Sequence, residues 1–215
     1  MNQNFNRQRL MRFIFSIIIL ITLIHLSSCK ETVSQQEINQ VTINTEEKAK
    51  KALEFIKQNK MNTDFCFLLD FSKHSGYKRF FVWNFNSNEI THEFLVSHGA
   101  GSNTWSGTET MDNPDFSNTD GSHLSSLGKY KIGERGWSNW GINIKYLMHG
   151  LEPSNSNALK RVVVLHGWEA ISDQETYPKG TPEGWGCPAV SNQTMIVLDE
   201  MLKTAEKPVL LWIYN

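Results

Sequence analysis

Closely spaced cysteines, hydrophobic runs long enough to span a membrane and an excess of positive charge are all missing from this sequence. The 215 residues include three cysteines, none of them in a Cys-x-x-Cys pair, and no His-x-x-x-His spacing occurs. These absences give no indication of a metal site, and no cofactor is expected. Lysine and arginine number 21 against 22 aspartate and glutamate residues. Because a nucleic-acid-binding surface carries excess positive charge, no nucleic acid partner is expected.

What the sequence does contain is typical of a globular, β-rich domain. Hydrophobic residues make up 40% of the chain and charged residues 20%, as in folded globular proteins. The 12 Phe, 7 Trp and 5 Tyr residues are large, flat side chains that pack well on strands. No internal repeat or heptad pattern is present. The composition therefore favours one domain with a mainly β core.

Residues 1–28 have the features of an export signal. Arg7, Arg9 and Arg12 precede an apolar run from Phe13 to Leu26. As a helix rising about 1.5 Å per residue, this run spans about 21 Å, less than a hydrocarbon core of about 30 Å. A signal peptide is therefore favoured over a transmembrane helix.

The residues after this run resemble the lipobox of bacterial lipoproteins. Leu26-Ser-Ser-Cys29 has the form in which the cysteine becomes the acylated first residue of the mature chain. The resemblance implies lipid on Cys29 and an exported protein anchored to a membrane in the cell envelope, on the periplasmic or the outer-membrane face. An ordinary cleaved signal with an incidental cysteine is the alternative. Residues 29–43 are polar and are interpreted as a tether, which leaves a folded domain over 44–215.

The pattern beyond the tether predicts strands between two helices. Asn44 and Glu47 form a capping-box pattern before apolar residues at i, i+3, i+4 and i+7, which predicts a helix over about 45–60. A second helix is predicted over 192–203. Runs of β-branched and aromatic residues predict strands at 65–71, 78–86, 90–97, 129–132, 141–147, 161–166 and 208–214. The predicted fold class is mainly β with two flanking helices.

Cys187 is the candidate nucleophile. It follows Gly184-Trp-Gly in a glycine-rich turn, where backbone N–H groups are left uncovered and can stabilise an oxyanion. Pro188 favours an extended conformation at Cys187, which suits a nucleophile on a turn. A purely structural cysteine in a tight turn is the alternative. Cys66 lies in an apolar run of strand length and is expected to be buried and unpaired.

A base for this thiol is expected among three His-Gly pairs. A thiol with a pKa of about 8.5 is mostly protonated near neutral pH and needs such a base to become a nucleophile. His98, His149 and His166 each precede a glycine and follow a β-like segment. His166 is preferred because it ends the most apolar run and lies closest in sequence to Cys187, although His98 or His149 could face the same cleft.

Together these features resemble the L,D-transpeptidase (YkuD) catalytic domain. The shared pattern is His166-Gly after an apolar strand, followed by Gly-Cys187-Pro-Ala-Val. This form is close to the divergent murein L,D-transpeptidase branch, which is common among lipoproteins. Phe116-Ser-Asn and the segment from Gly121 to Tyr130 also resemble that branch. The likeness covers roughly residues 65–214.

The resemblance implies a β-sandwich-like fold and a cysteine acyltransferase acting on peptidoglycan stem peptides. Cys187 is then the nucleophile and His166 the general base. The backbone carbonyl of Gly167 would hold the imidazole as the aspartate does in a serine-protease triad. The backbone N–H groups of Trp185 and Gly186, with that of Cys187, would form the oxyanion hole. The thiol would displace a terminal D-Ala, and an amine would resolve the thioester.

Two departures from the family pattern leave the substrate side open. Gly184 replaces the usual Ser or Thr, and Ala189 stands where most members have arginine. Another residue must supply that charge, and Lys160, Arg161 and Lys179 are the candidates.

The acyl acceptor and the oligomeric state are open as well. Water in place of an amine would make the protein an L,D-carboxypeptidase, and a non-catalytic lipoprotein that only binds peptidoglycan is a further alternative. A papain-like peptidase is disfavoured, because in that family the cysteine precedes the histidine along the chain.

Overall fold

The computed structural model describes residues 44–102 and 114–215. The larger of the two units of the chain is Lys48–Asn215. The expected signal peptide, Cys29 and the whole of the expected tether, 29–43, lie outside the described residues. Within the described ranges, no helix is both long enough and apolar enough to cross a membrane.

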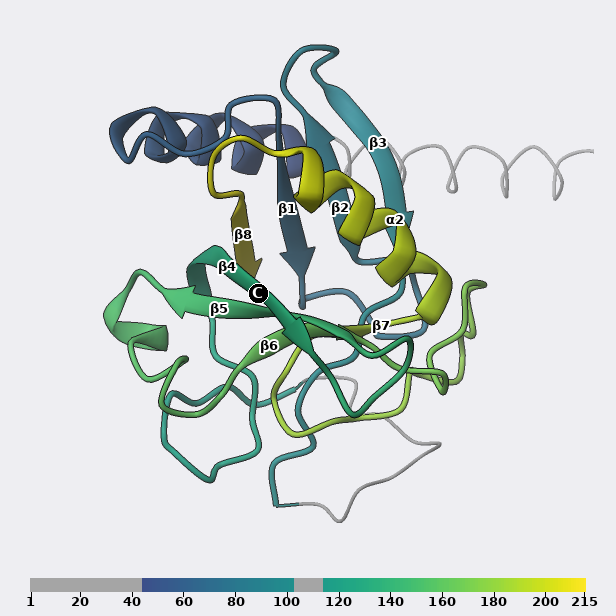
Figure 1. Ribbon diagram of the computed structural model, residues 1–215. Helices are drawn as coiled ribbons and strands as arrows, with labels where there is room; N and C mark the ends of the chain where they lie inside the picture. The colour runs from purple at the N-terminus through teal and green to yellow at the C-terminus, as the bar shows by residue number, and fades with distance from the viewer. Residues whose placement is uncertain (1–43, 103–113) are drawn as a thin grey trace, which may run out of the picture. The chain divides into compact units, whose positions relative to one another are not determined.

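Eight strands of the described residues form one mixed sheet in the larger unit (Figure 1). They are β1 (Phe65–Asp70), β2 (Phe80–Asn84), β3 (Glu89–Phe94), β4 (Gly128–Trp137), β5 (Ile144–Gly150), β6 (Val164–Gly167), β7 (Ala189–Val190) and β8 (Leu210–Tyr214). Their order across the sheet is β3-β2-β1-β8-β4-β5-β6-β7. The β1–β8 and β6–β7 pairs are parallel, and the other neighbours are antiparallel.

The middle of the sheet is buried on both faces. In β1, the side chains of Phe67, Leu68 and Leu69 are all fully buried, and so is Leu211 on the neighbouring strand β8. A strand covered on both faces has a continuous apolar sequence rather than an alternating one. This explains why the sequences of these two strands are continuous apolar runs.

Besides the strands, the described residues form two α-helices and a short 3-10 helix, η1 (Pro153–Asn155). One covers residues 44–58 and buries Ala52 and Ile56 completely. The other, α2 (Asn192–Thr204), begins at Ser191, whose hydroxyl accepts a hydrogen bond of 2.9 Å from a backbone N–H in the first turn. Its buried face adds Met195 and Leu198 to the core. The mainly β fold with two flanking helices is therefore confirmed, and its strands belong to a single continuous sheet.

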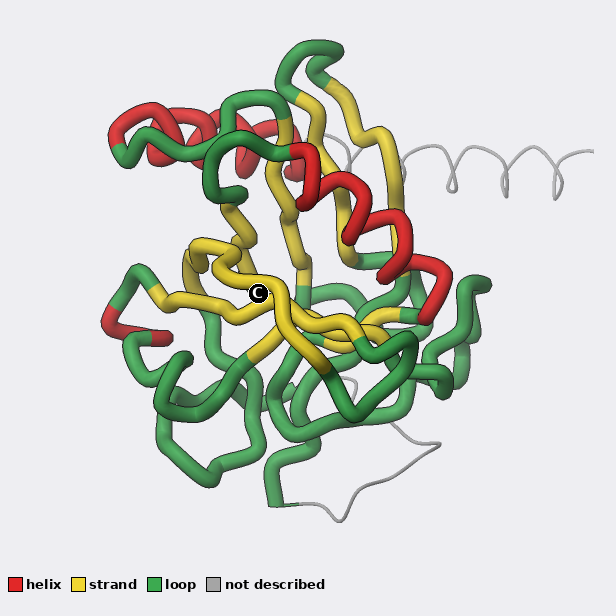
Figure 2. The backbone as a smooth tube through the Cα atoms, in the orientation of Figure 1, coloured by secondary structure: helices red, strands yellow, loops and turns green. Residues whose placement is uncertain are grey.

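The connections that carry the candidate site differ from the sequence prediction. The predicted strand 161–166 begins only at Val164, because the preceding residues form turns in which the N–H of Arg161 donates to the carbonyl of Asn157 at 2.8 Å. Val162 ends this turn with a φ of 55°. The two-residue strand β7 was not predicted at all. In Figure 2 the long connections gather together beyond the strands, in the lower half of the view.

Candidate active site

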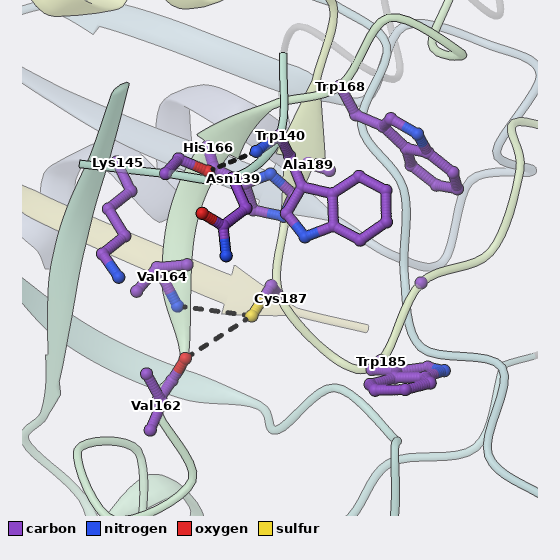
Figure 3. A pocket seen from close by; sticks show the side chains of 12 residues that line it. Asn139, Trp140, Lys145, Val162, Val164, His166, Trp168, Trp185, Cys187 and Ala189 are labelled. Carbon is purple, nitrogen blue, oxygen red and sulfur yellow. Dashed lines mark hydrogen bonds between the residues drawn. The ribbon is translucent and has the colours of Figure 1, made fainter. Parts of the chain in front are cut away.

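A cavity of about 240 Å³ opens beside β6 (Figure 3). Its lining includes Cys187, His166, Lys145, Asn139, Trp140, Trp168, Trp185, Val162 and Val164. No acidic residue is part of its lining as far as the chain is described. Nor does any group of His, Cys, Asp or Glu among the described residues have an arrangement that could hold a metal ion.

The parallel pairing of β6 with β7 brings Cys187 beside β6. The register places His166 opposite Ala189, so two residues back along both strands Cys187 falls beside Val164. The N–H of Val164 donates to the Cys187 sulfur at 3.4 Å, and the thiol reaches the carbonyl oxygen of Val162 at 3.7 Å. Side chains two residues apart on a strand share a face. His166 therefore lies on the same face of β6 as the residue that contacts the thiol.

The imidazole of His166 is held in one tautomer. Its Nδ1 lies 2.9 Å from the carbonyl oxygen of Gly167. A carbonyl oxygen can only accept, so Nδ1 carries the hydrogen and Nε2 of the neutral ring keeps its lone pair. Burial lowers the pKa of His166, opposed by the bond to Gly167 and assisted by the positive charge of Lys145. The ring is therefore neutral at neutral pH and able to accept a proton.

The thiol of Cys187 is also neutral at rest. Burial raises its pKa, while the N–H of Val164 and the positive charges of Arg161 and Lys145 oppose that rise. A raised thiol pKa beside a lowered imidazole pKa disfavours a preformed thiolate–imidazolium pair. Any nucleophilic attack by Cys187 therefore requires the proton to leave the sulfur as the attack proceeds.

Trp185 and Gly186 lie on the turn that leads into Cys187. Gly186 has a φ of 96°, and a Cβ there would lie 2.5 Å from the carbonyl oxygen of Leu124, so only glycine fits. The side chain of Trp185 is 61% exposed and stacks on the ring of His123 at 4.8 Å between centroids. The turn is thus fixed by its backbone, while its aromatic side chain remains accessible from the cavity.

A second chain segment, at His98–Ala100, is hydrogen-bonded to the start of this turn. The N–H of Gly184 donates to the carbonyl of His98 at 2.8 Å, and the N–H of Ala100 donates to the carbonyl of Gly184 at 2.8 Å. Next to these hydrogen bonds, Arg79, His98 and Glu183 form a buried polar row, with His98 between the two charged side chains. The row anchors the residue immediately before the glycine-rich turn.

The protonation of the row follows from its donors. The guanidinium of Arg79 can only donate, so Nδ1 of His98, 2.8 Å away, accepts. Nε2 of His98 then carries the hydrogen and donates to the Glu183 carboxylate at 3.2 Å. Burial lowers the pKa of His98, which keeps the ring neutral between the two charges. Burial also lowers the pKa of Arg79 to about 9, and its remaining donors bind the carbonyls of Val96 and Lys73.

Only one of the three His-Gly histidines lines the cavity. His98 is buried in the polar row, and His149 lies 3.4 Å from Glu134 beside a different cavity. The sequence allowed either of them to face the same cleft as Cys187, and the structure places neither there. His166 is the histidine that the fold brings together with the thiol.

None of the three cations proposed from the sequence lines the cavity. Arg161 donates to backbone and hydroxyl oxygens of the segment 117–126, behind the turn. Lys160 pairs with a surface carboxylate at 3.4 Å, and Lys179 lines a separate cavity. The cation that does line the cavity is Lys145 on β5, which the sequence analysis missed. No local sequence signal singles it out.

The chain matches the family model of the L,D-transpeptidase catalytic domain, YkuD_2, over residues 35–214. Because this match covers most of the chain, the protein belongs to that family. The resemblance inferred from His166-Gly and Gly-Cys187-Pro is thereby confirmed at the level of the family. No curated protein matches the chain.

Solved structures with similar folds have low sequence identity to this chain. An L,D-transpeptidase from Xylanimonas cellulosilytica is 14% identical, with a TM-score of 0.38 over 70% of this chain and 60% of that one. The helical cell shape determining protein Pgp2 from Campylobacter jejuni is 12% identical, with a TM-score of 0.42 over 72% and 49%. The Ldtfm-avibactam carbamoyl enzyme is 10% identical, with a TM-score of 0.40 over 71% and 49%. The chain thus spans between about half and three-fifths of these structures.

We expect the Glu183→Gln substitution to lower the free energy of unfolding by about 3 kcal/mol, because the buried Arg79 guanidinium would lose one of the two carboxylates, Asp70 and Glu183, whose charges offset its desolvation. Denaturant unfolding measures the change. The matched control is Glu134→Gln, which alters an exposed carboxylate that also faces a histidine and should leave stability unchanged. Equal unfolding free energies for Glu183→Gln and the wild type would show that the row does not depend on this charge.

Proposed function

We propose that the protein is an L,D-transpeptidase that transfers a peptidoglycan stem peptide through a thioester on Cys187, with His166 as the general base. The observation that carries the proposal is one cavity lined by both the thiol, which lies against β6, and a neutral imidazole whose Nδ1 is bound to the carbonyl oxygen of Gly167. That arrangement leaves Nε2 as the proton acceptor. Family membership supports the reaction class.

In the first half-reaction, Nε2 of His166 takes the thiol proton as the sulfur of Cys187 attacks the carbonyl before the terminal D-Ala. The tetrahedral oxyanion then accepts hydrogen bonds from backbone N–H groups of the turn. In the described part of the chain, the N–H groups of Gly186 and Cys187 have no acceptor, which suits them to this role. The Trp185 N–H remains a prediction from the family resemblance. The carbon–nitrogen bond breaks, and His166 returns the proton to the leaving D-Ala amine.

In the second half-reaction, an amine on another stem peptide or on a protein attacks the thioester. His166 removes a proton from that amine, the carbon–sulfur bond breaks, and the thiol of Cys187 takes the proton back. Water in place of the amine would give the L,D-carboxypeptidase outcome. Both outcomes share the acyl-enzyme, so the acceptor is decided by product analysis.

The proposal includes a cellular location for this reaction. Lipid on Cys29 would hold the catalytic domain, residues 44–215, at a membrane of the cell envelope, where peptidoglycan is the neighbouring polymer. Residues 29–43 would then act as the tether between the lipid and the domain. The support is the sequence of the leader and the lipobox-like tetrapeptide.

The nucleophile is tested with a Cys187→Ser variant. We expect its acyl-enzyme and its products to be nearly absent with an unchanged melting temperature, since a hydroxyl is far harder to ionise than a thiol. Mass spectrometry after incubation with a tetrapeptide donor and an amine acceptor, or with a carbapenem, locates the adduct. Cys66→Ala is the control, because burial raises the pKa of the Cys66 thiol well above its usual range. An adduct on Cys66, or none on Cys187, contradicts the proposal and favours a lipoprotein that only binds peptidoglycan.

The base is tested with matched histidine variants. His166→Ala should lower the acylation rate by about 10²- to 10⁴-fold, the usual contribution of a general base. His149→Ala, which alters a histidine outside the cavity, should acylate at the wild-type rate. Because burial lowers the pKa of His166, the ring stays neutral at more acidic pH than an ordinary histidine. The acid limb of the wild-type rate should therefore have its midpoint below about pH 6.5. A loss of turnover in His149→Ala but not in His166→Ala would reassign the base.

The proposed membrane anchor is tested with a Cys29→Ala variant in cells. We expect this variant to leave the membrane fraction, because the acyl chains that anchor the protein can no longer be attached. Fractionation and mass spectrometry of the mature N-terminus provide the measurement, and the activity of a 44–215 fragment should be retained. Recovery of wild-type protein with an unmodified Cys29 would rule out the lipid anchor.

A further inference from the structure

We propose that Lys145 is a substrate-binding residue that recognises a carboxylate of the acyl donor next to the scissile bond. This inference rests on the proposed function, because it assigns the donor side of the same cavity. Lys145 would supply the positive charge that most family members carry on an arginine at the position of Ala189.

The sheet places Lys145 directly beside the proposed base. Lys145 on β5 is the antiparallel partner of His166 on β6, and directly opposite residues of antiparallel strands present their side chains on the same face. Figure 3 shows Lys145, Asn139 and Cys187 facing the same cavity. The positive charge of Lys145 adds to the lowering of the His166 pKa by burial and opposes the rise of the Cys187 pKa, as expected for a cation close to both groups.

The ammonium group of Lys145 is not neutralised by any residue that the structure describes. Within 44–102 and 114–215, it has neither a hydrogen-bond acceptor nor a carboxylate partner. Other lysines of this domain are paired: Lys129 lies 2.6 Å from Glu152, and Lys203 lies 2.6 Å from Glu200. An unpaired cation in a cavity without acidic lining is a site for an anion.

The lysine stem is supported so that its charge reaches the cavity. On its other side, Lys145 pairs with Gly136 of β4, and a Cβ at Gly136 would lie 3.7 Å from Cε of the lysine. The stem therefore runs over a residue without a side chain of its own. A supported stem has fewer accessible rotamers, so the side chain loses less conformational entropy when its ammonium group binds an anion.

The remaining lining residues fit a peptide that carries a carboxylate better than a ligand that has only charged and polar groups. Trp140 and Trp185 are 42% and 61% exposed, so both offer apolar ring surface to a ligand. The amide of Asn139 adds a hydrogen-bond donor beside the lysine. A stem-peptide donor combines these properties, since it carries an aliphatic diamino acid and a carboxylate near the attacked carbonyl. That carboxylate is either the C-terminus of the leaving D-Ala or one on the side chain of the diamino acid.

Donor kinetics test the inference with Lys145→Gln and the matched control Lys131→Gln. Lys131 is also a strand lysine opposite a histidine, His149, but it lies outside the cavity. We expect Lys145→Gln to raise KM for the tetrapeptide donor at least tenfold with kcat within threefold of wild type, and Lys131→Gln to change neither. A Lys145→Arg variant should restore KM, because it restores the charge.

Modified donors identify which carboxylate is bound. If amidation of the terminal D-Ala makes wild type and Lys145→Gln equal, the lysine binds the terminal carboxylate. If a donor without the side-chain carboxylate has that effect, it binds the diamino acid. If Lys145→Gln keeps its tenfold defect with both modified donors, the residue does not recognise a carboxylate and the inference is wrong.

Alkylation of Cys187 separates this inference from the proposed function, because it needs no turnover. Iodoacetate carries a carboxylate and iodoacetamide does not, and both form a carbon–sulfur bond as iodide leaves. Lys145→Gln should lower the iodoacetate-to-iodoacetamide rate ratio about tenfold, as for loss of one favourable charge contact. An unchanged ratio overturns the inference, and so does equal slowing of both reagents, since the lysine would then act on the thiol alone. A lowered ratio in a protein without transpeptidase activity would support the carboxylate site while refuting the proposed function.

Discussion

The pairing of β6 with the two-residue strand β7 is the contact on which the candidate site depends. It places the glycine-rich turn against the strand that carries His166, so that the thiol is within reach of backbone groups of Val162 and Val164. Two residues of strand supply few ladder hydrogen bonds. The turn is therefore held from behind as well, by the segment at His98 and by the buried row that ends at Glu183. The short strand β7 and the buried polar row thus together hold the turn in a position that a longer strand could have fixed alone.

Burial sets the protonation of both reacting groups in the same cavity. Desolvation disfavours charge on the imidazole and on the thiol alike, so the resting state holds one proton on sulfur and leaves Nε2 unprotonated. The polar row behind the turn shows the opposite arrangement, because its charges are balanced by each other through His98. The domain thus holds two histidines as neutral rings for different purposes. His166 keeps a lone pair on Nε2 as a proton acceptor. His98 uses both ring nitrogens to connect the Arg79 guanidinium to the Glu183 carboxylate.

The parts of the site that are predictable from sequence are those with local signals. A histidine ending an apolar run and a cysteine in a glycine turn stand out without knowledge of the fold. The mainly β class follows in the same way from aromatic and β-branched runs. Lys145 has no such signal, because its position depends on the register of β5 against β6, and the segment joining them is too irregular to specify that register. Arg79 is similar: it resembles any polar residue beside a strand until the fold brings it to His98 and Glu183.

The position of β8 has a consequence for the order in which the domain can be assembled. β8 is the last strand along the chain, yet it lies between β1 and β4 and is the only strand that pairs with both halves of the described sheet. The β1–β3 half and the half that bears the site can join only after Leu210–Tyr214 has left the ribosome or an export channel. A protease that cut the segment before β8 would release the central strand rather than trim an edge. Emergence of β8, and not emergence of the cavity residues, is therefore the step that commits this domain to its folded form.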